Sequence, residues 1–194
     1  LGVLFPPPIV SVLVLVAALL VTGGLHMDGW ADLIDGLSGS YNREDALRIF
    51  KDPHVGSMAV AGVVLLVLLK YACLNTLAPA AVPPALVSMA TLSRYAMVQL
   101  ACFSPYARAT GGTGELFVRG IRLRHHIAAL LLALGSVWLF GGWHGVCIGV
   151  LVGLVTLGLQ VYFYRRLGGI TGDVLGATNE LHEALVLLLA TVAY

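Results

Sequence analysis

The sequence predicts an all-α fold: a polytopic integral membrane helical bundle with about six or more transmembrane helices. Of the 194 residues, 59% are hydrophobic and only 11% are charged, whereas an average soluble domain has about 25% charged residues. Several apolar runs approach the roughly 20 residues that cross a bilayer as a helix. The short alternating segments typical of a membrane β-barrel do not occur in the sequence.

Six apolar segments are predicted, at about residues 8–25, 57–77, 85–103, 126–140, 144–163 and 184–194. Short turns, rich in proline or glycine, join the second segment to the third and the fourth to the fifth. The long polar connections are loop A (26–56), loop B (104–125) and loop C (164–183). We expect one transmembrane catalytic domain over residues 1–194. Because the chain starts at Leu1 rather than Met, we also expect an N-terminal part to be missing from it.

The basic residues predict the orientation in the membrane. Every Lys and Arg except Lys70 and Arg94 lies in loops A, B and C. If each segment spans once, these loops share one face, and the positive-inside rule makes that face cytoplasmic. We therefore expect a multi-pass protein of the bacterial cytoplasmic (inner) membrane, with its active site facing the cytoplasm and no acid in the centre of a span. The net charge of +1 says nothing about nucleic acid. No RNA- or DNA-binding motif appears in the sequence, so we expect no nucleic-acid partner.

Loop A begins with three aspartates, in the stretch His26-Met-Asp-Gly-Trp-Ala-Asp-Leu-Ile-Asp-Gly36. Their spacing of i, i+4, i+7 puts Asp28, Asp32 and Asp35 within roughly 60° of one helix face. Like charges so close repel one another unless a cation or protons intervene. The glycines after the outer two leave space for a ligand. We therefore expect these three residues to bind a divalent metal, with Asp32 and Asp35 also catalytic.

The second half of loop A is expected to form a short helix over about residues 43–51, capped by Asn42. Two interpretations stay open. The helix is either a solvated amphipathic element on the membrane or a lid whose Arg48 and Lys51 bind substrate phosphate. Asp52, which follows it, is a candidate further metal ligand.

Loop C repeats the pattern of glycine beside acid. Asp173 and Glu180 are seven residues apart and share a helix face, and Thr171 is a candidate N-cap. We expect both acids to complete one metal site with those of loop A, the alternative being a glycine-rich interfacial turn with ordinary caps. A set of carboxylates without cysteine favours Mg²⁺, which typically binds a few carboxylates, waters and substrate phosphates.

Four further residues are candidates for the site. Arg94 is costly inside an apolar segment, so it belongs either to the catalytic site or to a structural pair. His26 is a candidate acid–base group, or a structural hydrogen-bonding residue. Arg108 and Asn179 are candidate substrate-binding residues. Lys70, nearer a helix end, is expected to snorkel to the interface.

These motifs resemble the cobalamin synthase family (adenosylcobinamide-GDP ribazoletransferases). The resemblance rests on the stretch 26–36, on Arg43-Glu44, on Ile49-Phe-Lys-Asp-Pro-His-Val-Gly56, on Ser104-Pro-Tyr-Ala-Arg108, and on Gly168-Gly-Ile-Thr-Gly-Asp-Val-Leu-Gly-Ala177 with Glu180. The motifs are ordered along most of the chain. The family's N-terminal segment before the first span is not seen here.

The resemblance implies a Mg²⁺-dependent membrane transferase that joins adenosylcobinamide-GDP to α-ribazole or its 5′-phosphate and releases GMP. Its partners are then the corrinoid nucleotide, α-ribazole and the lipid bilayer; the sequence leaves the oligomeric state open, and a homo-oligomer is compatible with it. One alternative is a CDP-alcohol phosphotransferase, although the Ala-Arg expected after the first Asp-Gly is replaced by Ala31-Asp32. Another is a divalent-cation transporter, which predicts acids inside the spans.

Overall fold

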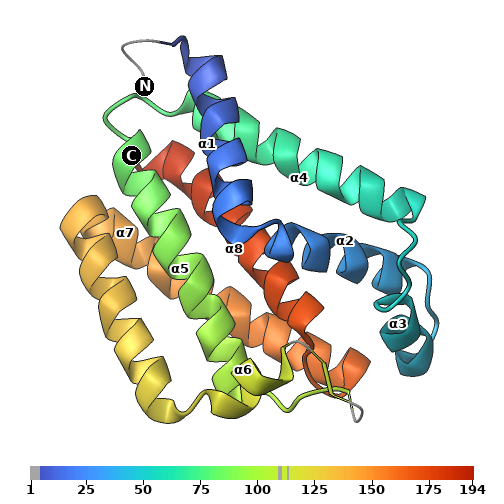
Figure 1. The fold of residues 1–194 in the computed structure, drawn as a ribbon. Helices are drawn as coiled ribbons and strands as arrows, with labels where there is room; N and C mark the ends of the chain where they lie inside the picture. Colours follow the sequence, from blue (N-terminus) through green and yellow to red (C-terminus); the bar gives the residue numbers. More distant parts are fainter. Residues whose placement is uncertain (1–4, 109–110, 113) are drawn as a thin grey trace.

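The computed structural model describes residues 5–108, 111–112 and 114–194, and the regular structure in these ranges is helical apart from one isolated β-bridge (Figure 1). The helices there are α1 (Pro7–Thr22), α2 (Leu25–Ser38), α3 (Arg43–Ile49), α4 (Ser57–Thr76), α5 (Val82–Phe103), α6 (Glu115–Gly120), α7 (Leu123–Leu167) and α8 (Gly172–Ala193). The all-α prediction is confirmed. Residues 109, 110 and 113 of the predicted loop B lie outside the described residues.

Three helices of the described chain are long and apolar enough to cross a membrane: α4, α5 and α7. Helices α1 and α2 meet at 91° and make a fourth candidate if the bent pair is one span. Helix α2 alone is not a candidate, because it is short and carries three aspartates. The predicted membrane bundle is therefore confirmed, with three or four candidate spans by length and composition.

Helix α7 is a hairpin rather than a straight rod. Its 45 residues are interrupted at Gly142, whose φ of 56° and ψ of −142° are not helical, a conformation that glycine adopts readily. Beyond the interruption, Gly145 packs against the backbone of Val137, and Figure 1 shows the two arms running in opposite directions. The arms correspond to the predicted segments 126–140 and 144–163.

Loops A and C are largely helical, in agreement with the helix predicted at about residues 43–51 and with the helical spacing of the acids in both loops. Loop A contains α2 and α3, and Asn42 Oδ1 accepts a hydrogen bond from the Asp45 amide at 2.9 Å, as the predicted cap requires. Loop C contains the N-terminal half of α8, whose cap Thr171 accepts from the Val174 amide at 3.3 Å. Many of the polar residues in this half are buried inside the bundle. The predicted segment 184–194 is therefore only the second half of a 22-residue helix.

Helix α8 occupies the centre of the bundle, in contact with α2, α4, α5 and α7. One core cluster includes Leu92 of α5 and Leu187 of α8. A second includes Leu33 of α2, Leu100 of α5 and Leu167 of α7. In a bilayer such cores are held mainly by close packing and interhelical hydrogen bonds.

Helices α2 and α8 approach closely because glycines lie at their contact. A Cβ atom at Gly29 would lie 2.8 Å from the carbonyl oxygen of Asp173, and one at Gly176 would lie 3.1 Å from the Cα of His26. The space beside Gly36 is filled by the ring of Phe50. The expectation that glycine beside acid leaves space for a ligand is therefore wrong at these three positions, because protein atoms occupy that space.

Candidate active site

The contact between α2 and α8 brings together acids that are far apart in the sequence. We call Asp28, Asp32 and Asp173 the aspartate cluster. Asp28 and Asp32 lie one helical turn apart on α2, and Asp173 lies in the first turn of α8. Gly29 of α2 touches the backbone of Asp173. The structure thus places the first acid of α8 against the predicted acids of α2.

The electrostatics of Asp32 reflect this crowding. Burial raises the pKa of Asp32 to about 6, with further upward contributions from the charges of Asp28 and Asp173, while Arg108 lowers it. Within the described residues, Asp28 and Asp32 make no side-chain hydrogen bond or ion pair. Their charges are therefore available to a cation.

Arg108 is held next to Asp173 by a short backbone pairing. The Ala107 amide donates to Ile170 O at 2.8 Å, and the Ile170 amide donates to Pro105 O at 2.9 Å. The pairing joins the segment after α5 to the segment before α8, so that Arg108 Nη2 lies 2.7 Å from Asp173 Oδ2. The Nε atom of Arg108 is buried without a partner in the described part of the chain. Arg108 therefore retains donor capacity for an anion beside the aspartate cluster.

The donor set of the cluster suits Mg²⁺. Across the described residues, no three His, Cys, Asp or Glu side chains are grouped closely enough to hold a metal by themselves. Mg²⁺, however, is commonly held by one or two carboxylates together with waters and substrate phosphates. Asp28 and Asp32 supply two hard oxygen ligands of this kind, so the residues present fit the ion.

Asp35 has a structural role that the sequence did not reveal. Its Oδ2 accepts a hydrogen bond from the Gly56 amide at 2.5 Å, and its Oδ1 accepts one from the Ala59 amide at 2.8 Å. Gly56 is the N-cap of α4 and Ala59 lies in its first turn, where unpaired N–H groups favour a negative charge. Asp35 therefore connects the end of α2 to the start of α4, and its predicted roles in metal binding and catalysis stay predictions.

Asp52, Arg48 and Lys51 lie apart from these contacts, on α3 and the turn after it. Asp52 Oδ1 pairs with His54 Nδ1 at 2.6 Å, and hydrogen bonds from His54 lower the pKa of Asp52. Arg48 pairs with Asp45 at 3.2 Å and is 75% exposed, and Lys51 is also exposed. Asp52 lines a pocket of about 370 Å³ together with Asp35. Within the described chain, no hydrogen bond or ion pair joins these three residues to the aspartate cluster.

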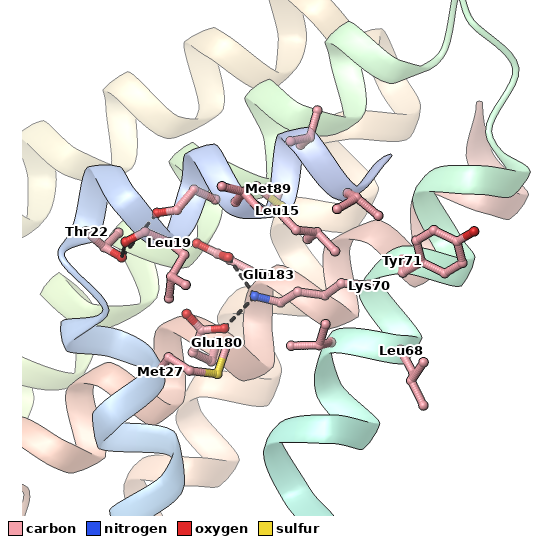
Figure 2. Close-up of a pocket in the computed structure, with 15 residues that line it drawn as sticks. Leu15, Leu19, Thr22, Met27, Leu68, Lys70, Tyr71, Met89, Glu180 and Glu183 are labelled. Atoms are coloured by element: carbon pink, nitrogen blue, oxygen red, sulfur yellow. Dashed lines mark hydrogen bonds and ion pairs between the residues drawn. The ribbon is translucent and has the colours of Figure 1, made fainter. Parts of the chain in front are cut away.

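The second acid of α8 belongs to a different group. We call Lys70, Arg94, Glu180 and Glu183 the ion cluster. Lys70 Nζ lies 2.5 Å from Glu180 Oε2 and 2.7 Å from Glu183 Oε2, and Arg94 Nη1 lies 2.5 Å from Glu183 Oε1. Figure 2 shows the Lys70 side chain reaching from α4 to both glutamates of α8. The ion cluster connects three helices, and two positive charges balance two negative ones.

The ion cluster corrects two expectations. Lys70 does not snorkel, since it is only 3% exposed. Glu180 and Glu183 are 5% and 3% exposed, so acids do occur in the interior of the bundle. Glu180 pairs with Lys70, whereas Asp173, two turns earlier on α8, lies beside the acids of α2. The predicted place of Glu180 in one metal site with these acids stays a prediction.

His26 and Asn179 lie near the ion cluster. Asn179 is fully buried, and its Nδ2 donates to Glu183 Oε1 at 2.9 Å. His26, next to Gly176, is within the electrostatic influence of Arg94, Glu183 and Lys70. In the described chain, His26 Nδ1 and Asn179 Oδ1 are buried without partners. Sequence reasoning missed Lys70 as a site residue, although a charge within the apolar segment 57–77 was an available signal.

Taken together, the fold and the two clusters define a polytopic helical membrane protein with converging carboxylate and arginine side chains. The family model for cobalamin-5-phosphate synthase matches residues 1–191. The chain belongs to this family, which confirms the resemblance seen in the sequence, and it is therefore an enzyme.

Relatives named adenosylcobinamide-GDP ribazoletransferase cover nearly the whole chain. The one from Chlorobaculum tepidum is 41% identical over 191 residues, 96% of this chain and 74% of the relative. The one from Chlorobium phaeobacteroides is 40% identical over 183 residues, 93% and 74% of the two chains. The one from Syntrophobacter fumaroxidans is 38% identical over 189 residues, 97% and 76%. No solved structure gives a significant match.

Proposed function

We propose that this protein transfers the cobinamide phosphate of adenosylcobinamide-GDP to α-ribazole, or to its 5′-phosphate, and releases GMP. The observation that carries the proposal is the aspartate cluster with Arg108, in a chain that belongs to the cobalamin-5-phosphate synthase family. Diphosphate chemistry requires charge neutralisation at the phosphates and a positioned nucleophile. The aspartate cluster can hold a cation at the diphosphate, and Arg108 can bind a phosphate oxygen beside it. Charge neutralisation and positioning of the substrate are therefore available in one place.

In this reaction the hydroxyl of the ribazole ribose attacks the cobinamide-linked phosphorus. A new P–O bond forms to the ribose oxygen, the P–O bond to GMP breaks, and the hydroxyl proton is given up. Arg108 binds a phosphate oxygen through a guanidinium already oriented by Asp173. Asp32 and His26 are the two candidates to accept the proton. If Asp32 binds Mg²⁺, the cation lowers its pKa, and His26 is then the acceptor.

Asp28 and Asp32 would hold Mg²⁺, with Asp173 alongside. When bound, the ion neutralises the diphosphate and stabilises the leaving group. Arg48 and Lys51 on α3 are further candidates for phosphate contact. The proposal places the cluster at the cytoplasmic face of the bacterial inner membrane, because nine of the eleven basic residues lie in the three long connections.

The decisive measurement is GMP release from adenosylcobinamide-GDP by the purified protein in the presence of α-ribazole and Mg²⁺. Asp32→Asn should lower turnover by orders of magnitude while the variant still inserts and folds. Glu44→Gln is the matched control, because Glu44 is exposed on α3 away from the cluster. Near-normal turnover of Asp32→Asn at limiting Mg²⁺ would refute the assignment of this residue.

The two alternatives from the sequence gain no support. A CDP-alcohol phosphotransferase is not the family that matches. A cation transporter predicted acids inside the bundle, and Glu180 and Glu183 are indeed there. Their charges are, however, paired with Lys70 and Arg94, which leaves them poor ligands for a transported cation.

A further inference from the structure

A cavity of about 440 Å³ lies beside the ion cluster (Figure 2), and no residue of the aspartate cluster lines it. Its walls are mostly apolar side chains of α1 and α4, among them Val12, Leu15 and Leu68, with Met89 of α5. Lys70, Glu180 and Glu183 form its charged end. The volume lies in the roughly 300–1,000 Å³ range of small-molecule sites, which typically combine apolar walls with a few convergent polar groups.

We propose that this cavity binds the bicyclic aromatic base of the ribazole nucleoside, a benzimidazole. This inference rests on the proposed function and deepens it, since it assigns one part of one substrate to residues outside the aspartate cluster. Three features of the cavity carry it: its apolar walls, a hydrogen-bond donor at its charged end, and the two lining residues, Leu19 and Met27, that it shares with a pocket beside Asp28.

The donor is the ammonium group of Lys70. An ammonium carries three N–H donors, and in the described residues Lys70 Nζ uses two of them, on Glu180 and Glu183. The third N–H suits the unsubstituted ring nitrogen of a benzimidazole, which accepts a hydrogen bond in the plane of the ring. The lysine side chain is 4% exposed, so this donor is pre-positioned and shielded from bulk water.

The cavity also leads toward the aspartate cluster. Leu19 and Met27 line it, and both also line a second pocket of about 530 Å³ that includes Asp28. On α8, Glu180 lies seven residues beyond Asp173, a rise of roughly 10 Å along the helix, which is comparable to the length of a nucleoside. A base beside Lys70 therefore places its ribose toward Met27 and Asp28, where the hydroxyl must react.

A lipid acyl chain is the other candidate for an apolar cavity in a membrane protein, and the charged end argues against it. An acyl chain has no acceptor for the third N–H of Lys70, and its insertion would leave that donor unpaired in an apolar environment, which costs free energy. A heteroaromatic base satisfies the donor and fills the apolar walls at the same time.

Two neighbouring alanines of α1 allow a matched test. Ala18 lines the cavity, whereas Ala17 is exposed and does not. GMP release is measured with each substrate varied in turn. Ala18→Phe should raise the KM for α-ribazole by about tenfold or more, in line with the roughly 10–200-fold effect of small shape changes in apolar pockets. The KM for adenosylcobinamide-GDP should stay unchanged, and Ala17→Phe should behave as wild type.

Free benzimidazole provides a second readout on the unmodified protein. It should inhibit competitively with α-ribazole, and indole, which lacks the accepting ring nitrogen, should inhibit much more weakly. The inference is overturned if Ala18→Phe leaves the KM for α-ribazole unchanged, if both KM values rise together, or if indole and benzimidazole inhibit equally. Loss of co-purified lipid from Ala18→Phe without a change in KM identifies an acyl chain as the occupant and also overturns it. If the wild-type protein releases no GMP, the proposed function is refuted instead. The cavity is then tested separately by benzimidazole binding, which should be saturable in the wild-type protein and absent in Ala18→Phe.

Discussion

Replacement of Lys70 by Met should destabilise the protein by about 3–5 kcal/mol, the usual cost of removing one partner from a buried ion pair. The lysine and Glu180 side chains are 4% and 7% exposed, so solvent screens their interaction little. Within the described residues Lys70 is the only ion-pair partner of Glu180, whereas Glu183 keeps Arg94 and Asn179. The cost therefore comes chiefly from Glu180, left charged and unpaired.

Thermal unfolding of the detergent-solubilised protein, followed by helical circular dichroism, measures this effect. At roughly 2–4 °C per kcal/mol for a chain of this size, Lys70→Met should lower the Tm by about 6–20 °C. The double variant Lys70→Met/Glu180→Gln should recover most of the loss, because the orphaned charge is gone. Arg94→Met should cost only about 1 kcal/mol, since Arg94 is 40% exposed and Glu183 keeps Lys70. A single Lys70→Met variant as stable as wild type, or no recovery in the double variant, would refute the reasoning.

Three other predictions address Asp35, the α2–α8 contact and the topology. Asp35→Ala should lose about 0.5–2 kcal/mol of stability with the cap of α4. Asp35→Asn should keep only part of that stability, because its Nδ2 group cannot accept the second amide hydrogen bond. Normal turnover of Asp35→Asn would exclude a catalytic charge there. Gly29→Ala should destabilise the protein by about 1–3 kcal/mol, because the added Cβ clashes with the Asp173 backbone. Gly135→Ala is the control and should be neutral or stabilising, because Gly135 has open space around it. Equal Tm values for the two variants would contradict this prediction. Tyr41→Cys, at a fully exposed position, in a background without Cys73, Cys102 and Cys147, should react with a membrane-impermeant thiol reagent in inverted vesicles but not in intact cells. Labelling of this cysteine in intact cells would refute the predicted topology.

Features set by local sequence were predictable. The caps Asn42 and Thr171 were identified because a short polar side chain before a helical pattern satisfies the free amides of the first turn. The helical spacing of Asp28 and Asp32 predicted that they share a helix face. The glycine-rich turn at residues 141–143 predicted the chain reversal within α7. Each of these depends on residues a few positions apart, where the geometry of the chain leaves few alternatives.

Features set by tertiary contacts were not predictable in the same way. Lys70 and Glu180 are separated by 110 residues, and the sequence does not show that α4 and α8 turn these side chains toward each other. The partners of Asp35 are backbone amides, which every segment possesses, so no residue type marks them. The burial of Glu180 and Glu183 was not predictable, because a buried, paired charge and a solvated charge look alike in a single sequence.

The ion cluster has a consequence for the order in which the protein is assembled during synthesis. Helix α8 is not apolar enough to count as a candidate span, and it carries both buried glutamates. Its two counter-charges, Lys70 and Arg94, lie on α4 and α5, which are made earlier and are candidate spans. The last helix is therefore expected to enter the membrane only after α4 and α5 are in place, because their charges offset the cost of bringing Glu180 and Glu183 into it. Chains truncated before α8 should then leave Lys70 and Arg94 unpaired in the bilayer, a state that membrane quality-control proteases can recognise.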